Sequence, residues 1–177
     1  MLPTPWPLPA FEDFTPEVLK AIFAEPKVVT RAGRTKDVQG HQERQWSLAA
    51  VGEPERIYRL YTRQLRVVRA KFSAGLILEL PGRKLTLCRY NGPSHPHSNP
   101  LPPRAKCPNG SPHRHVARAD YLAAGLPGDR YAEPDDRYRT LAGALHVLVN
   151  DCNIRGVSTE PDEQEPWDDS KQTYLDL

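Results

Sequence analysis

The chain has 177 residues, a hydrophobic content of 38% and a mean hydropathy of −0.63, which together predict one domain with a buried core and sizeable polar, irregular segments. No apolar run approaches the ~20 residues that a membrane-spanning helix requires, and the N-terminus lacks the basic and apolar regions of a secretory signal. Three cysteines leave one without a partner, which is typical of a reducing cytoplasm rather than of a disulfide scaffold. We therefore expect a cytoplasmic protein that does not bind membranes.

The net charge of +2 hides an uneven distribution along the chain. Residues 27–118 contain 18 Lys and Arg against 5 Asp and Glu, whereas residues 119–177 contain 5 against 13. A basic block of this size suits a polyanion, because each phosphate contact releases condensed counterions. The block makes nucleic acid a candidate partner, and the alternative is a solvated face that binds nothing.

Residues 1–14 are rich in proline and are expected to form an extended N-terminal arm. A single domain is expected to follow over residues 15–156. Its first helix is predicted to begin after Thr15, which is a suitable N-cap, with Pro16 at the first helical position, and to end before Pro26.

Residues 27–42 are polar and basic and are expected to cross the surface as a loop. Residues 44–51 and 56–65 flank a Gly-Glu-Pro-Glu turn, which predicts a β-hairpin. A helix over residues 56–69 is the alternative, because five arginines of that stretch recur at helical spacing. Aromatic and β-branched residues favour the strand.

Residues 72–80 and 84–89 flank Pro81-Gly82-Arg83 and predict a second hairpin. Strict alternation in its second strand would place Leu85, Leu87 and Arg89 on one face and Thr86, Cys88 and Tyr90 on the other. Residues 113–118 are expected to return to the sheet as a strand. Residues 120–125 are expected to form a helical turn that ends at a glycine.

An amphipathic helix is predicted over residues 138–153, with Asp135 or Asp136 as its cap. Residues 157–177 are acidic and poor in aliphatic side chains, which indicates a flexible tail. Strands followed by a helix predict the α+β class: a small antiparallel sheet of two hairpins plus a return strand, packed by N-terminal and C-terminal helices.

Residues 89–115 form a long connection with seven prolines and two glycines, which is incompatible with a helix interior or a central strand. Long irregular connections in compact domains are usually functional or disordered. This one contains four of the six histidines, as the His-x-His pairs His95/His97 and His113/His115. Their density indicates function.

One interpretation of these histidines is acid–base catalysis without a metal. Residues i and i+2 of a strand point to the same side, so His113 and His115 can act as base and acid on one phosphodiester. The predicted catalytic set is His113, His115, His95, Arg89 and Tyr90. The predicted nucleic-acid-binding set is Arg114, Arg118, Arg104, Lys106, Arg63 and Arg66.

Two other interpretations stay open. The ligand types His95, His97, Cys107, His113 and His115 suit tetrahedral zinc, although their spacing matches no common structural-zinc pattern. The histidines can also be surface residues of a polar loop. No cofactor is required by the acid–base interpretation, so zinc is the alternative.

Several runs resemble a group of small prokaryotic proteins without a settled activity, over roughly residues 70–155. They are Phe72-Ser73-Ala74-Gly75-Leu76, Arg89-Tyr90-Asn91-Gly92-Pro93-Ser94-His95, His113-Arg114-His115, Tyr131-Ala132-Glu133-Pro134, Asp136-Arg137-Tyr138 and Asp151-Cys152-Asn153. The order Arg-Tyr-Asn, His, His-x-His is more distantly similar to the TumE-type toxins of toxin–antitoxin pairs. That resemblance implies an activity on RNA or nucleotidyl substrates and an antitoxin partner. It extends a role to Arg89, Tyr90, Asn91, His95, His113 and His115. The Pro-rich insert 96–112 and the acidic tail depart from the family.

The sequence thus predicts a metal-independent endoribonuclease of toxin or defence type. The alternatives are a non-catalytic nucleic-acid-binding module and a component that docks on a partner subunit.

Overall fold

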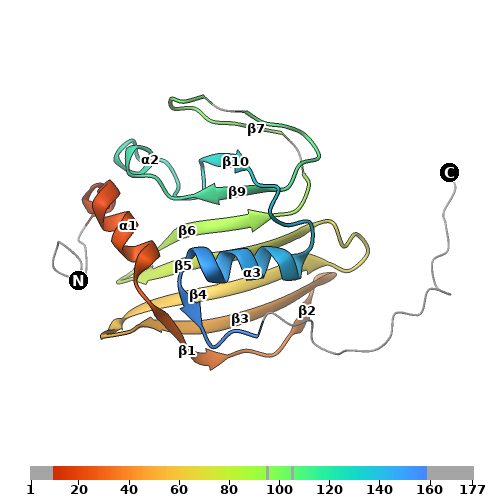
Figure 1. Ribbon diagram of the computed structural model, residues 1–177, viewed down its shortest axis with the longest axis horizontal. Helices are drawn as coiled ribbons and strands as arrows, with labels where there is room; N and C mark the ends of the chain where they lie inside the picture. Colours follow the sequence, from red (N-terminus) through yellow and green to blue (C-terminus); the bar gives the residue numbers. More distant parts are fainter. Residues whose placement is uncertain (1–9, 95, 105, 159–177) are drawn as a thin grey trace, which may run out of the picture.

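The computed structural model describes residues 10–94, 96–104 and 106–158, and a mostly antiparallel sheet lies at its centre (Figure 1). The strand order is β10-β9-β6-β5-β4-β3-β1-β11, β2 pairs with β3, and the parallel pair is β1 with β11. The large sheet consists of β1 (Lys27–Ala32), β2 (Lys36–Val38), β3 (His41–Ala50), β4 (Glu53–Leu65), β5 (Phe72–Leu80), β6 (Arg83–Asn91), β9 (His113–Val116), β10 (Ala132–Pro134) and β11 (Ile154–Arg155). A separate two-stranded sheet pairs β7 (His97–Ser98) with β8 (Lys106–Cys107).

The helices are η1 (Phe11–Asp13), α1 (Pro16–Ala24), α2 (Ala119–Ala123) and α3 (Leu141–Asp151). Figure 1 shows α1 and α3 lying across one side of the sheet, which we call the helix face. The hydrophobic core lies between these two helices and the sheet. It buries apolar side chains of both helices and of the central strands, among them Ile22, Leu60, Leu76 and Leu148. None of the described helices is long and apolar enough to span a membrane.

The α+β class is confirmed, but the prediction of a small sheet of two hairpins and a return strand is wrong. Residues 27–42, expected as a loop, form β1, β2 and the start of β3. These strands lie toward one side of the sheet, and most of their side chains are exposed. The hydrophobic alternation that reveals a half-buried strand is therefore missing from this stretch.

Both predicted hairpins are confirmed. Residues 53–65 form one continuous strand, so the helical alternative for residues 56–69 is wrong. In that strand Tyr58 and Leu60 are buried in the core, and the residues between them point to the opposite face. Of the five arginines that suggested a helix, Arg56 lies on the face of Tyr58, Arg59 and Arg63 lie on the opposite face, and Arg66 and Arg69 follow the end of the strand.

Strict alternation fails in β6, because a bulge interrupts its pairing with β5. Leu78 pairs with Leu85 and Leu76 pairs with Cys88, so Leu87 is the extra residue. Leu85 and Cys88 consequently share the helix face, and the predicted grouping of Leu85, Leu87 and Arg89 is wrong. The bulge turns Arg89 to the opposite face.

Two helix ends are fixed by side chains. Thr15 accepts a hydrogen bond from the Val18 amide at the start of α1, as predicted. At the start of α3 the cap is Thr140, which accepts from the Gly143 amide at 3.1 Å, so the assignment to Asp135 or Asp136 is wrong. Asp135 is instead buried and binds Arg137.

The loop between β6 and β9 folds back over the sheet. Asn99 fixes it, because its side-chain amide donates to the Ala132 carbonyl at 2.7 Å and its oxygen accepts from the Ala132 amide at 2.8 Å. The side chain thus pairs with the β10 backbone as a neighbouring strand would. Two residues before Asn99, His97 is held close to β9. The expectations for the arm over residues 1–9 and the tail over residues 159–177 lie outside the described residues.

Candidate metal centre

The strand β9 presents alternate residues to opposite faces of the sheet. Arg114 pairs with Tyr90 of β6, and Tyr90 donates a hydrogen bond to Asp151 at the end of α3. This pair therefore lies on the helix face. His113 and His115 point to the other side, which we call the histidine face.

Residues directly opposite one another in an antiparallel pair lie on the same side. On the histidine face this register builds two rows across β4, β5, β6 and β9. The first row is Tyr61, Gly75, Arg89 and His115, and the second row is Arg63, Ser73, Asn91 and His113.

The imidazole rings of His97, His113 and His115 lie against one another at the β9 end of these rows. The ring centroids of His97 lie 4.5 Å from His113 and 4.9 Å from His115, and those of His113 and His115 lie 5.2 Å apart. One ring nitrogen of each residue lies within 4.8 Å of the corresponding nitrogen of the other two. His113 and His115 are 1% and 2% exposed, and His97 is half-buried.

The hydrogen bonds of His113 resemble those of a metal ligand. Its Nδ1 lies 3.1 Å from the Ser111 carbonyl, which can only accept, so Nδ1 bears the proton in the neutral ring. Its Nε2 then carries the lone pair and accepts a hydrogen bond from the Asn91 side-chain amide at 3.3 Å, a bond that a metal ion at Nε2 would replace. A carbonyl that fixes the tautomer in this way is the usual outer partner of a metal-bound histidine.

His115 is a buried imidazole whose two ring nitrogens make no hydrogen bond of ordinary geometry with the described residues. Burial, with the nearby charge of Arg89 and the rings of His113 and His97, lowers its pKa to about 3, against a smaller opposing effect of the Asp129 backbone. The ring is therefore neutral at physiological pH. An unpartnered buried polar group is rare in a folded protein and calls for a ligand or an ion.

This cluster fits a divalent metal of the zinc type. Neutral imidazoles are zinc ligands, and tetrahedral bonds of 2.0–2.1 Å place ligand nitrogens roughly 3.4 Å apart. Small ring rotations would bring nitrogens within 4.8 Å to that separation. Three protein ligands would leave one coordination position open, as in catalytic rather than structural zinc sites.

The other predicted ligands differ in their placement. Cys107 pairs with His97 in the β7–β8 sheet and is buried, but it is not a member of the cluster. His95 lies outside the described residues. All three histidines of the cluster thus belong to the five ligands that were predicted from the sequence.

Of the predicted catalytic residues, Arg89 lies beside the cluster, next to His115 in the first row. Tyr90 lies on the helix face, away from the histidine rings, where its hydroxyl binds Asp151 at 2.6 Å.

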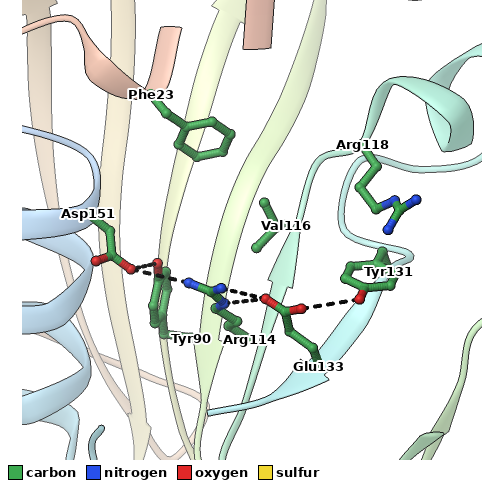
Figure 2. A pocket seen from close by; sticks show the side chains of 8 residues that line it. All are labelled: Phe23, Tyr90, Arg114, Val116, Arg118, Tyr131, Glu133 and Asp151. Atoms are coloured by element: carbon green, nitrogen blue, oxygen red, sulfur yellow. Dashed lines mark hydrogen bonds and ion pairs between the residues drawn. The ribbon is translucent and has the colours of Figure 1, made fainter. Parts of the chain in front are cut away.

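A pocket of about 400 Å³ occupies the helix face at this end of the sheet (Figure 2). Its lining includes the predicted nucleic-acid-binding residues Arg114 and Arg118. Figure 2 shows Arg114 between the carboxylates of Glu133 and Asp151. Arg118 binds Asp120. Both guanidinium groups are thus already neutralised by acidic side chains.

The remaining predicted nucleic-acid-binding residues are dispersed. Arg63 lies in the second row and pairs with Glu43, and Arg66 pairs with Asp37 near the β4–β5 turn. Arg104 and Lys106 are exposed in the loop that leads back to β9. The basic block is therefore not one continuous cationic surface, since several of its arginines bind carboxylates.

Sequence reasoning missed the residues that support the cluster. Asn99 bonds the Ala132 backbone, and the Ser111 carbonyl bonds the His113 ring. No sequence motif predicts these contacts, because both involve backbone groups. Tyr61 was assigned only to a strand, and its neighbours across the sheet follow from strand register. Asn91 entered only through the family resemblance.

Comparison of the chain with protein-family models, with curated proteins and with solved structures gave no match.

Proposed function

We propose that the protein binds one divalent metal ion of the zinc type through His97, His113 and His115 and uses it in hydrolysis. The observation that supports this proposal is the convergence of three imidazole nitrogens within 4.8 Å, two of them on buried rings. Burying the His115 imidazole costs free energy unless its ring nitrogens acquire a partner, and both lack a hydrogen bond of ordinary geometry among the described residues. A metal ion supplies one partner to all three.

A metal with three histidine ligands and an open position lowers the pKa of a bound water toward neutrality and polarises a substrate oxygen. The protein's part is to orient the ligands and to shape the approach. The Ser111 carbonyl fixes the tautomer of His113, and His97 packs against the buried rings of His113 and His115. In hydrolysis the water oxygen would bond to the electrophilic atom, the bond between that atom and the leaving group would break, and a proton of the water would go to the leaving group.

The metal-independent ribonuclease is the second proposal. It is favoured by the rings of His113 and His115, 5.2 Å apart on one side of a strand with Arg89 adjacent. The metal proposal ranks above it because a general acid must be protonated, and the pKa of His115 is lowered to about 3 by burial, Arg89 and the neighbouring rings. Activity on RNA and an antitoxin partner belong to this second proposal.

The decisive experiment is metal content. We expect about one zinc per chain by mass spectrometry after purification without added metal, and a cobalt-substituted protein with the visible spectrum of a four-coordinate site that has three nitrogen ligands. The His97→Ala variant should lose the metal while it keeps the wild-type circular dichroism, because His97 is the half-buried ligand and lies in a loop.

The matched control is His146→Ala, which removes an exposed imidazole from α3. It should bind metal as the wild type does. Failure of the wild type to take up zinc or cobalt would refute the metal proposal. Cleavage of labelled RNA that persists in EDTA and disappears in His113→Ala would favour the ribonuclease.

A further inference from the structure

Buried polar atoms without hydrogen-bond partners gather on the histidine face. Among the described residues they include Ser73 Oγ, Arg89 Nε and both ring nitrogens of His115. Ser73 and Arg89 lie on adjacent strands of the two rows, and Arg89 is directly opposite His115. The metal proposal explains His115 and gives no partner to Arg89 Nε; Ser73 Oγ makes no hydrogen bond of ordinary geometry, although it lies near the Tyr61 phenol.

Among the described residues, the acidic partner of the Arg89 guanidinium is Asp129. Its Nη1 lies 3.1 Å from Asp129, and its side chain is 33% exposed. A guanidinium has five N–H donors, and one carboxylate cannot satisfy all five. The group is both anchored and able to bind a further acceptor.

Tyr61 extends this donor set from β4. A Cβ added to Gly75 would lie 2.5 Å from Cε1 of Tyr61 and 2.6 Å from its hydroxyl, so the hydroxyl end of the ring lies over Gly75. The hydroxyl therefore reaches across β5 toward Arg89. Burial raises the pKa of Tyr61 despite the opposing effects of Ser73 and Arg89, so the phenol stays protonated and can donate.

The pocket on the helix face is the competing location for an anion. There Arg114 contacts the carboxylates of Glu133, Asp135 and Asp151, and Arg118 contacts Asp120. An anion would have to displace these carboxylates. The histidine face imposes no such requirement on the free donors of Arg89.

We propose that the surface formed by Tyr61, Ser73 and Arg89 binds the phosphoryl group of the substrate next to the metal, which makes the substrate a phosphate ester. This inference rests on the proposed metal centre, because hydrolysis of the bound phosphate ester would require the metal ion. A hydroxyl, a phenol and a guanidinium stand on one face of three adjacent strands, so their donors outnumber the two oxygens of a carboxylate and suit the larger number of oxygens on a phosphoryl group. Arg89 supplies the positive charge.

Inorganic phosphate is the probe for the first test. Calorimetric titration of metal-free and zinc-loaded protein should show binding in both, tighter with zinc. The variant Arg89→Met should weaken phosphate binding by about tenfold or more, because a charge-assisted contact is lost, and Arg89→Lys should recover part of it. Acetate at equal ionic strength should bind more weakly than phosphate.

The matched control is Arg59→Met, which removes an arginine of the same face that binds Glu79. Its phosphate affinity should equal that of the wild type. Equal affinities in Arg89→Met and Arg59→Met, equal binding of acetate and phosphate, or no phosphate binding at all would overturn the proposal. Metal uptake is measured separately on the same variants, so failure of the metal centre and failure of the phosphate site are distinguishable.

The second test uses turnover by the zinc-loaded protein. Hydrolysis of a p-nitrophenyl phosphate monoester or of the corresponding diester, lost in Arg89→Met while zinc content is kept, supports the proposal. Hydrolysis of only p-nitrophenyl acetate contradicts it. A diester preference with cleavage of a dinucleotide would identify nucleic acid as the source of the phosphoryl group.

Discussion

At the residue scale, Lys27 is a buried cation that the sequence placed in a surface loop. Its Nζ donates to the carbonyls of Ile22, Glu25 and Cys152 at 2.6, 3.0 and 2.9 Å, and it lies 5.0 Å from the Tyr58 ring centroid. The pKa of Lys27 is lowered by burial, although the nearby groups Cys152 and Glu25 oppose that effect. One ammonium thus satisfies backbone carbonyls at the C-terminal ends of both α1 and α3.

We predict that Lys27→Met lowers the free energy of unfolding by about 3 kcal/mol, because several buried carbonyls lose their donor together. Urea unfolding followed by circular dichroism measures the change. Lys20→Met, an exposed change within α1, is the control and should cost less than about 0.5 kcal/mol. Similar costs for the two variants would show that the Lys27 contacts do not stabilise the fold.

At the element scale, the N-cap of α3 is Thr140, whereas the sequence predicted Asp135 or Asp136. Thr140 accepts from the Gly143 amide, whereas Asp136 is exposed and lies before the helix. Thr140→Ala should therefore destabilise the protein by about 1 kcal/mol, and Asp136→Ala should stay within about 0.5 kcal/mol. Thermal unfolding of the two variants measures this, and the reverse order would restore the assignment made from the sequence.

The 96–112 loop provides the second test at this scale. Asn99 joins it to Ala132, and the loop positions His97 over β9. Asn99→Ala should weaken zinc binding by about tenfold, as loss of outer support does at metal sites, measured by competition with a chromogenic chelator. Asn109→Ala, an exposed change in the same loop, should leave the affinity unchanged. Equal affinity in Asn99→Ala would mean that β9 alone orders the site.

At the scale of the whole molecule, stability depends on pH through buried groups. The folded pKa of His115 is lowered to about 3 by burial, Arg89 and the neighbouring rings, against about 6.5 in the unfolded chain. Below pH ~6.5 the unfolded state binds a proton that the folded state does not, so this contribution to stability falls as pH decreases toward ~3. Above pH ~6.5 it is constant.

We predict that the stability of the metal-free protein falls between pH 6.5 and 4 more steeply than that of His115→Gln, by up to about 1.4 kcal/mol per pH unit. Asp135 and Asp151 contribute the same sign at lower pH, because bonds to Arg137 outweigh burial and lower the pKa of each carboxyl. They remain in both proteins and cancel in the comparison. Identical slopes would show that His115 is protonated in the folded state.

Folding also pairs several arginines of the basic block with carboxylates. The basic block predicted a polyanion surface, but Arg59, Arg63, Arg66 and Arg89 each pair with a carboxylate across strands or turns. Counting charges along a chain cannot reveal these pairs, because the partners are distant in sequence. The nucleic-acid partner therefore stays a prediction, and the histidine face is the place where it is tested.

The sequence by itself determined the two hairpins, the first helix with its Thr15 cap, and the placement of His113 and His115 on one side of one strand. These features depend on local propensity and on the two-residue period of a strand. Only the tertiary structure decided that β1 and β2 exist, that a bulge turns Arg89 toward His115, and that His97 joins the other two rings. Each of these depends on register between strands or on a loop folding back, and such long-range pairing leaves no periodic signal in the chain.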